Sequence, residues 1–291
     1  MASEREFAGK TAVITGAASG IGAGLARHAA QLGVNLVLAD VQAEPLQRLA
    51  ATLPGRHITV ATDVSDADAV LQLAERAYET FEHVDLVFNN AGILLMGFLW
   101  EMDSAQFERQ MTVNVRGVFN VIRAFIPRMI AAGNPSRMIN TASIGGFIGC
   151  PLMASYAASK SAIVGLTESL HYEMQMLRTP VKISLLCPGP VKSEIFAKPL
   201  ELQSQNALVT DFLSARRKEQ ELYGLSTDQC ARVTFEGIAH GNYWLLPQPE
   251  LLDSLVRMRT DLILRRAEPG LGELMAESPA ANKRQAPHDS E

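Results

Sequence analysis

The sequence has few cysteines, and this scarcity narrows the possible kinds of site. Three occur among the 291 residues, Cys150, Cys187 and Cys230, and none belongs to a Cys-x-x-Cys pair. An odd number at wide spacing fits neither a disulfide framework nor a zinc site, so a reducing compartment is expected. The six histidines show no ligand spacing either. We therefore predict that no metal takes part in the chemistry.

A surplus of positive charge is also missing. Lysine and arginine total 26 residues against 31 aspartate and glutamate residues, so the net charge is −5. The sequence pI is near 5.7. A nucleic-acid partner would require a basic face, and none is expected here.

No stretch is both long and apolar enough to cross a membrane. The longest charge-free stretch, residues 138–159, is rich in Gly, Ser, Thr and Asn, and the apolar run 91–100 is too short. The first eight residues are acidic and lack the apolar core of a signal peptide. The sequence therefore predicts a cytoplasmic protein without a membrane partner.

The chain does contain short apolar runs that alternate with helical patterns. Strand-like runs lie at 11–15, 35–39, 57–61, 85–88, 137–141, 181–186 and 243–246, with helical patterns at about 20–32, 43–53, 66–81, 104–132, 155–177 and 227–239. Apolar strands in strict alternation with helices are typical of a parallel sheet covered on both faces. We predict one α/β domain over residues 1–266, a Rossmann-type doubly wound parallel sheet.

The alternation loosens in two places. Residues 190–225 show no clear strands, and we expect an irregular loop that contributes to substrate binding. An amphipathic helix follows Pro247 and Pro249, with apolar residues at helical spacing up to Ile263. The tail 267–291 is rich in Ala, Pro, Glu, Gly and Ser and is predicted to be mobile.

A glycine-rich turn joins the first strand to the first long helix. It reads Thr15-Gly-Ala-Ala-Ser-Gly-Ile-Gly22, and the residues expected to meet a ligand are Gly16, Ser19, Gly20, Ile21 and Gly22. Glycines permit a tight bend and close backbone approach, while the helix N-terminus offers N–H groups to a phosphate. A simple connection is the alternative, but the strand before and the helix after favour a dinucleotide site.

Asp40 ends the second strand, 20 residues after Gly20. A carboxylate here can accept hydrogen bonds from ribose hydroxyls and would repel a 2′-phosphate. Position 41 is Val41, so no cation compensates, and NAD is favoured over NADP. Capping of the next helix is the alternative role for Asp40. The pair Asp63 and Val64 follows the third strand, where Asp63 could meet the adenine amino group or cap a helix.

Tyr156 and Lys160 lie four residues apart, on one face of a predicted helix. A neighbouring ammonium would lower the pKa of a phenol from its ordinary value of about 10, so this pair can act as a general base or acid. Ser143 closes the fifth strand candidate, 13 residues before Tyr156. Its hydroxyl could hold a substrate oxygen.

Together these motifs resemble the short-chain dehydrogenase/reductase family, in its compact single-domain subgroup. The resemblance spans roughly residues 7–246. It implies an enzyme in which Tyr156 exchanges a proton with the substrate oxygen while hydride moves to or from NAD. Ser143 would steady that oxygen, and Lys160 would lower the pKa of the phenol and reach the nicotinamide ribose.

Other residues acquire roles only through this resemblance. Asn114 matches the asparagine whose backbone holds a water in a proton relay to the lysine. The motif Asn89-Asn90-Ala91-Gly92 matches one that stabilises the sheet and lies beside the nicotinamide. The turn that contacts the carboxamide would be formed by Pro188, Gly189, Val191 and Ser193, where Ser193 replaces the more usual threonine and keeps the hydroxyl.

The substrate is expected to be a hydrophobic, aromatic or cyclic secondary alcohol or ketone. Three segments should define its pocket, 93–100, 144–153 and 190–225, and their apolar residues are Leu94, Leu95, Met96, Phe147, Ile148, Met153, Phe196, Leu200 and Phe212. Each of these residues could instead belong to the core.

A second resemblance agrees with this substrate class. Residues 127–133, 143–149 and 247–263 are similar to bacterial dehydrogenases that oxidise the benzylic alcohol of lignin-derived aryl ethers. Family members are usually homotetramers or homodimers that pack through the helices near 104–132 and 155–177. In this chain Leu166, Leu170, Met174 and Leu177 could serve that interface or the monomer core.

Two other functions stay open at this point. An NADPH-dependent carbonyl reductase would use the same trio, but Asp40 opposes a 2′-phosphate. A sensor or scaffold that binds dinucleotide without turnover would typically lack the catalytic tyrosine or lysine, and this chain keeps both.

Overall fold

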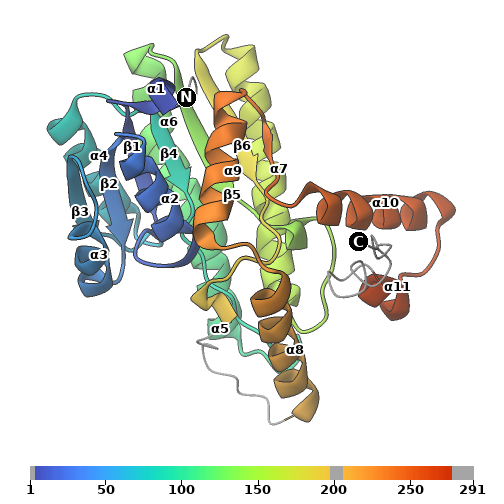
Figure 1. Cartoon of the computed structure of the whole chain (residues 1–291). Coiled ribbons are helices and arrows are strands. Elements are labelled where there is room, and N and C mark those ends of the chain that lie inside the picture. Colours follow the sequence, from blue (N-terminus) through green and yellow to red (C-terminus); the bar gives the residue numbers. More distant parts are fainter. Residues whose placement is uncertain (1–3, 197–205, 277–291) are drawn as a thin grey trace, which may run out of the picture.

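The computed structural model describes residues 4–196 and 206–276. Its centre is a seven-stranded parallel sheet in the order β3-β2-β1-β4-β5-β6-β7 (Figure 1). The strands are β1 Thr11–Thr15, β2 Asn35–Asp40, β3 His57–Ala61, β4 Leu86–Asn89, β5 Ser136–Thr141, β6 Val181–Leu186 and β7 Trp244–Leu245. The predicted Rossmann-type doubly wound fold is confirmed.

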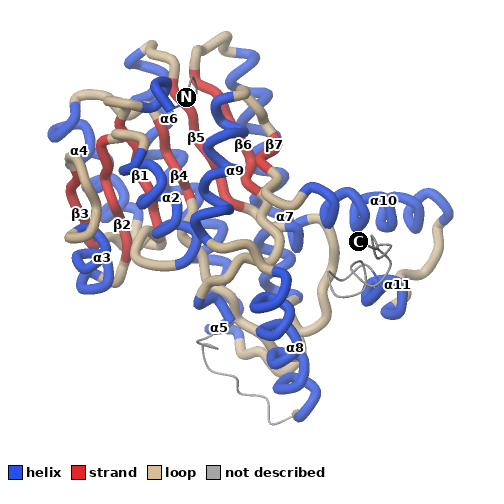
Figure 2. Tube along the Cα trace, in the orientation of Figure 1, coloured by secondary structure: helices blue, strands red, loops and turns tan. Residues whose placement is uncertain are grey.

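Helices cover both faces of this sheet (Figure 2). The helices are α1 Glu4–Phe7, α2 Gly20–Gln31, α3 Ala43–Ala50, α4 Ala67–Phe81, α5 Ser104–Met111, α6 Gly117–Ala132, α7 Ala154–Met176, α8 Ala207–Tyr223, α9 Thr227–Ala239, α10 Pro249–Arg265 and α11 Leu271–Ala276. A π-helical turn, Thr112–Arg116, joins α5 to α6. In Figures 1 and 2, α8, α10 and α11 lie outside the two layers that cover the sheet.

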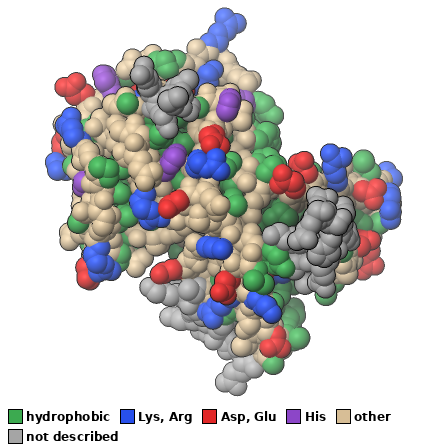
Figure 3. All heavy atoms as spheres, in the orientation of Figure 1, with side chains coloured by type: hydrophobic (Ala, Val, Ile, Leu, Met, Phe, Trp, Pro, Cys, Tyr) green, Lys and Arg blue, Asp and Glu red, His purple; other side chains and the backbone are tan. Residues whose placement is uncertain are grey.

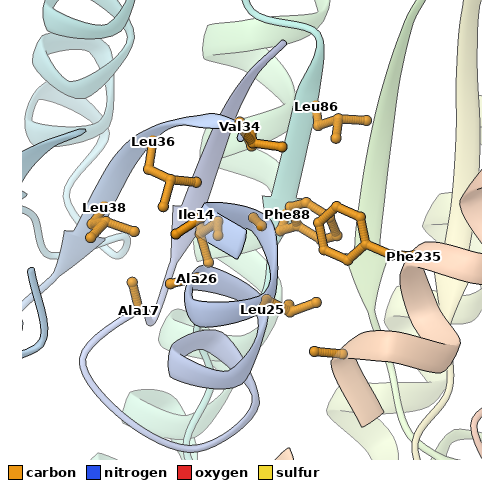
Figure 4. Close-up of a cluster of buried hydrophobic side chains, with 14 of the residues drawn as sticks. Ile14, Ala17, Leu25, Ala26, Val34, Leu36, Leu38, Leu86, Phe88 and Phe235 are labelled. Carbon is orange, nitrogen blue, oxygen red and sulfur yellow. The ribbon is translucent and has the colours of Figure 1, made fainter. Parts of the chain in front are cut away.

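The two largest buried apolar clusters lie on opposite sides of the sheet, because successive strand residues point to opposite faces. Ile14 and Phe88 pack with α2 and α9 on one face (Figure 4). Val13 and Val87 pack with α4, α6 and α7 on the other face. Both faces of β1 and β4 are therefore fully buried, which explains their uninterrupted apolar sequences.

The order of the strands reverses between β1 and β4. The chain proceeds outward from β1 through β2 to β3 and then returns to pair β4 with the other side of β1. Connections that leave the carboxyl ends of β1 and β4 therefore diverge and open a crevice, which is where ligands bind in such sheets.

The predicted irregular loop over 190–225 is wrong for most of the residues described there. Helix α8 begins after Asn206, whose side chain accepts a hydrogen bond from the Leu208 N–H, and an isolated bridge pairs Val191 with Leu225. Only Val209 and Leu213 are apolar and fully buried on α8, so the helix lacks the apolar stripe that the sequence reading relied on.

The tail contains a helix that the sequence does not predict. Helix α11 occupies Leu271–Ala276, residues 277–291 lie outside the described residues, and the mobility of the tail stays a prediction. No helix among the described residues is long and apolar enough to cross a membrane. On the face shown in Figure 3, charged groups of both signs are interspersed over the described surface.

The residues considered for an interface divide into two groups. Leu170 and Met174 are buried in the core of the single chain, whereas Leu166 and Leu177 are exposed, together with Phe119 of α6. Assembly through these helices stays a prediction, which the molar mass in solution would test.

Core packing around α2 leads to a stability prediction. Leu25 is fully buried between α2 and the sheet (Figure 4), so Leu25→Ala removes buried contacts and leaves a cavity. We expect this change to lower the free energy of unfolding by about 3 kcal/mol or more, measured by urea denaturation. The matched control is Leu264→Ala on α10, where the leucine is 72% exposed, and its effect should stay within about 0.5 kcal/mol. Equal losses in the two variants would contradict this packing.

Candidate functional site

The glycine turn after β1 is closely packed. Gly16 has φ of +65°, and a Cβ on it would lie 2.8 Å from the Ala91 Cα. A Cβ on Gly22 would lie 2.1 Å from the Gly16 carbonyl oxygen. Ser19 precedes α2 but makes no capping hydrogen bond with its side chain. The turn therefore requires glycine at both positions, and the N-terminus of α2 is available to an anionic group.

Asp40 connects the end of β2 to this turn. One oxygen of its carboxylate accepts from the Ala18 N–H and the other from the Gln42 N–H, each at 2.9 Å. The N-cap of α3 is Gln42, so Asp40 is not the helix cap considered as its alternative role. A carboxylate has about four acceptor positions, so two remain for ribose hydroxyls. Val41 beside it is 65% exposed and brings no charge.

Asp63 and Val64 are adjacent in sequence but differ in environment. The Asp63 side chain is exposed and accepts from the Ser65 N–H at 2.9 Å, while Asp66 caps α4. Val64 is buried in the core against Gly117. Asp63 is therefore accessible to an adenine ring, whereas the Val64 side chain is committed to packing.

The asparagine motif after β4 serves the sheet and the turn. Asn89 is buried and donates to the Val118 carbonyl and to the Asn140 side chain. Asn90 donates from its side chain to the Thr15 carbonyl at 3.0 Å. The Thr15 hydroxyl accepts from the backbone N–H groups of Asn90 and Ala91. These bonds hold the ends of β1 and β4 together beside the switch in strand order.

Asn114 lies in the π-helical turn and is fully buried. Its side chain accepts from the Ile93 N–H at 2.8 Å and donates to the Ile93 carbonyl and to the Ser159 hydroxyl. A Cβ on Gly92 would meet the Asn114 Oδ1 at 3.3 Å and the Lys160 Nζ at 3.5 Å. Asn114 and Gly92 are thus neighbours of Lys160, and π-helical turns are frequent at functional sites.

The predicted trio comes together from two elements. Ser143 follows β5, and its hydroxyl accepts from the Gly145 N–H at 3.1 Å. Tyr156 and Lys160 lie on α7, with the Lys160 Nζ 5.7 Å from the centre of the tyrosine ring. Lys160 is 4% exposed and donates to the Thr141 carbonyl at 2.9 Å.

Burial dominates the protonation of this trio. Desolvation raises the pKa of Tyr156, and a hydrogen bond with Ser143 opposes that rise. Desolvation also lowers the pKa of Lys160 to about 8, partly offset by Cys187. The sequence reading expected Lys160 to lower the pKa of the phenol. In this structure desolvation is the largest influence on both pKa values, and it favours the neutral form of each group.

The loop after β6 closes over the glycine turn. A Cβ on Gly20 would lie 3.4 Å from the Ser193 Cβ. Gln220 of α8 donates to the Val191 carbonyl at 2.6 Å and to the Ser193 hydroxyl at 3.4 Å. The Pro188 carbonyl accepts from the Ile144 N–H, which joins this loop to the Ser143 turn. Gly189 faces the Gln248 side chain, and a Cβ there would lie 2.6 Å from its Oε1.

Two cavities lie on either side of this loop. One of about 530 Å³ is lined by Ser19, Gly20, Arg27, Lys192 and Ser193, among others. Its wall carries both cations and the carboxylates of Glu194 and Glu221, and its position at the N-terminus of α2 suits the phosphates of a dinucleotide. The second, of about 200 Å³, contains Ser143 and Tyr156 in its wall. Asp40, Asp63 and Asn114 line neither cavity.

The second cavity, hereafter the apolar cavity, confirms part of the predicted pocket. The predicted residues found in its wall are Leu94, Ile148, Met153, Phe196 and Phe212. Leu95 is buried outside it, Met96 and Phe147 are absent from its wall, and Leu200 lies outside the described residues. Sequence reasoning missed Leu251, Leu255 and Leu274, because nothing local indicates that α10 and α11 fold back to this site.

No group of three or more His, Cys, Asp or Glu side chains within 4–196 and 206–276 could hold a metal ion.

Cys187 and Cys230 are buried, and burial raises the pKa of each thiol to about 12. These two cysteines are therefore inert packing residues.

Comparison with known proteins agrees with this geometry. The short chain dehydrogenase family matches residues 10–203. The chain belongs to the short-chain dehydrogenase family, and it is an oxidoreductase of that family. The predicted family resemblance is thus confirmed.

Three relatives illustrate its neighbours in this family. A 1-deoxy-11-beta-hydroxypentalenate dehydrogenase from Streptomyces arenae is 34% identical over 86% of this chain and 85% of that protein. A C alpha-dehydrogenase from Sphingobium sp. is 29% identical over 86% of this chain and 84% of that protein, which confirms the second resemblance. A short-chain dehydrogenase/reductase from Burkholderia phymatum, solved in complex with NAD, is 36% identical with a TM-score of 0.85, covering 91% of this chain and 98% of that one.

The low pKa of Lys160 predicts how pH changes stability. The folded protein releases this proton near pH 8, whereas an unfolded lysine keeps it to about pH 10.4. Between these values the unfolded state binds more protons, so this residue increases the stability of the folded state as pH rises. Between pH 7 and pH 10 this residue should add on the order of 2 to 3 kcal/mol to the free energy of unfolding of wild type, and Lys160→Met should lack this gain.

Urea denaturation of both proteins across this pH range measures the difference. Lys182→Met, at an exposed position on β6, is the control and should track wild type. A difference between Lys160→Met and wild type that does not change with pH would show that the ammonium is not desolvated.

Proposed function

We propose that this chain is an NAD-dependent oxidoreductase of hydrophobic secondary alcohols or the corresponding ketones, with cyclic or aromatic substrates preferred. The observation that carries this proposal is the apolar cavity. Ser143 and Tyr156 line it together with Ile21 of the glycine turn and Ser193 of the loop after β6. A single cavity thus connects the proton-transfer residues with the predicted cofactor turn.

The residues of the chain fit a dinucleotide. The glycine turn allows the backbone to approach the phosphates, Asp40 keeps two acceptor positions, and the cavity beside α2 carries cations. NAD, when bound, supplies the acceptor or donor of hydride. The relative from Burkholderia phymatum that contains NAD supports this choice of cofactor.

Proton transfer falls to Tyr156. Its phenol would take the proton of an alcohol or give its proton to a ketone oxygen, and the Ser143 hydroxyl would hold that oxygen by a hydrogen bond. Lys160, buried beneath the ring, would favour the phenolate whenever it is protonated. Asn114, next to Lys160 through Gly92, would hold the water that connects the lysine to solvent.

The substrate class follows from the wall of the cavity. Apart from the proton-transfer residues, the wall is built mainly from Leu, Ile, Met, Phe, Pro and Val side chains. Such a wall favours the burial of apolar rings over that of sugars, which need more amide and charged groups. The relatives named for a hydroxypentalenate and for a C alpha position are consistent with this choice. A preference for NAD would favour oxidation in a cytoplasm that keeps NAD oxidised.

Turnover tests the proposal directly. With a panel of aryl and alicyclic secondary alcohols, we expect NAD reduction that falls by at least about a hundredfold in Tyr156→Phe, since the general acid–base group is lost. Tyr172→Phe on the same helix, where the ring is 61% exposed, is the matched control and should retain activity. NAD binding by calorimetry without turnover of any alcohol or ketone would favour a dinucleotide-binding sensor.

Asp40 provides a test of cofactor choice. Asp40→Asn keeps the size of the side chain and removes the charge that would oppose a 2′-phosphate. We expect the ratio of kcat/KM with NAD to that with NADP to fall at least about tenfold, mainly because NADP improves. A wild-type preference for NADP would contradict the role assigned to Asp40 and favour a carbonyl reductase.

A further inference from the structure

The apolar cavity contains one charged pair that the proposed chemistry does not use. The only charged side chains among the described residues of its wall are Arg216 and Glu219 of α8. They form an ion pair of 2.7 Å between the Arg216 Nη1 and the Glu219 Oε2. Glu219 is 6% exposed, so this pair is largely removed from water.

The pair occupies a defined side of α8. Phe212, Arg216, Glu219 and Gln220 lie at helical spacing and all line the cavity. The Arg216 guanidinium lies over the Phe212 ring, 5.3 Å from its centre. Gln220 fastens this side of the helix to Val191 and Ser193. The guanidinium is therefore held between an aromatic ring and a carboxylate on a helix anchored beside the cofactor turn.

The hydrogen bonding of this pair is incomplete. The Arg216 Nε and the Glu219 Oε1 are both buried, and neither has a hydrogen-bond partner among the described residues. A buried ion pair is favourable only when its remaining donors and acceptors are also satisfied. Two residues that line the cavity thus carry one N–H donor and one carboxylate acceptor without partners.

We propose that the Arg216–Glu219 pair binds a hydroxyl group of the substrate, at a position separate from the carbon that exchanges hydride. A hydroxyl is both a donor and an acceptor, so it can accept from the Arg216 Nε or donate to the Glu219 Oε1. A substrate carboxylate could pair with Arg216 but would be repelled by Glu219. A methyl group in the same place would leave both atoms without partners.

This inference rests on the proposed function and narrows it to hydroxylated aryl or cyclic ketones and alcohols. Arg216 and Glu219 are specificity residues, because they contact the far end of the substrate and not the reacting atoms.

Binding of matched ketones to the full chain, in the presence of NADH, tests the proposal. The probes are para-hydroxy-, para-methyl- and para-carboxyacetophenone, together with three longer ketones in which a second phenyl ring separates the same substituent from the acetophenone ring. The Kd of each ketone is measured by calorimetry. For at least one of the two probe lengths, we expect the ketone with the hydroxyl substituent to bind at least about tenfold more tightly than those with the methyl or carboxylate substituent.

The variant Arg216→Met/Glu219→Leu should abolish or reverse this preference. It removes both charges together and leaves no unpaired ion in the cavity. Asp211→Leu/Lys218→Met, at exposed positions on α8 outside both cavities, is the matched control and should keep the preference. Thermal unfolding checks that each variant folds. If Arg216→Met/Glu219→Leu does not fold, Glu219→Gln replaces it and should reduce the preference for the hydroxyl ketone.

Four results would overturn the inference: equal Kd values for the para-hydroxy and para-methyl probes, tightest binding by the carboxylate, a hydroxyl preference that survives in the double variant, or failure of every para-hydroxy probe to bind. Turnover of all six ketones with NADH is measured in parallel. Activity toward the para-methyl probes without a hydroxyl preference removes this inference alone, whereas inactivity toward all six ketones also counts against the proposed function.

Discussion

A buried network of hydrogen-bonded polar side chains holds helix α7 and its residues of the site against the sheet. Asn89 of β4 donates to Asn140 of β5, and Asn140 donates to the Thr167 hydroxyl of α7. Thr167 in turn donates to the Ile163 carbonyl of its own helix. The donors and acceptors of this network pair with one another, so no side chain in it is left buried without a partner. The network thereby sets the position of α7 along the strands. Tyr156 and Lys160 inherit their position from this network.

Polar contacts matter more for α7 than for α4. Its buried residues include Ser155, Ser159, Lys160 and Thr167, whereas apolar side chains dominate the buried face of α4. Apolar packing has little directional preference, but hydrogen bonds fix both distance and direction. The bond from Lys160 to the Thr141 carbonyl joins α7 to the same strand that ends before Ser143. The trio is therefore aligned by polar bonds at the carboxyl end of β5.

Burial gives this trio its chemical character. Desolvation raises the pKa of the Tyr156 phenol and lowers that of the Lys160 ammonium to about 8. The proton therefore resides preferentially on the phenol, which is the form that can donate to a carbonyl oxygen. The wall of the apolar cavity is mainly apolar too, and Arg216 and Glu219 are the charged residues among its described lining.

Much of this arrangement was predictable from the sequence. The sheet followed from apolar runs, the glycine turn from Gly16, Gly20 and Gly22, and the pairing of Tyr156 with Lys160 from a spacing of four. Each depends on residues that are close in the chain, and local spacing determines local geometry. Ser143 follows a strand, and the carboxyl ends of parallel strands lie at one edge of the sheet, so its place at that edge was predictable too.

Tertiary structure decided what local spacing cannot express. Helix α8 has few buried apolar residues, so its sequence predicts an irregular loop, yet it brings Arg216 and Glu219 to the cavity. Leu251, Leu255 and Leu274 reach the same wall from the far end of the chain. The sequence by itself determined the fold and the spacing of Ser143, Tyr156 and Lys160, since these depend on periodicity and local geometry. The shape and polarity of the apolar cavity depend on contacts between distant segments, and those exist only once the chain has folded.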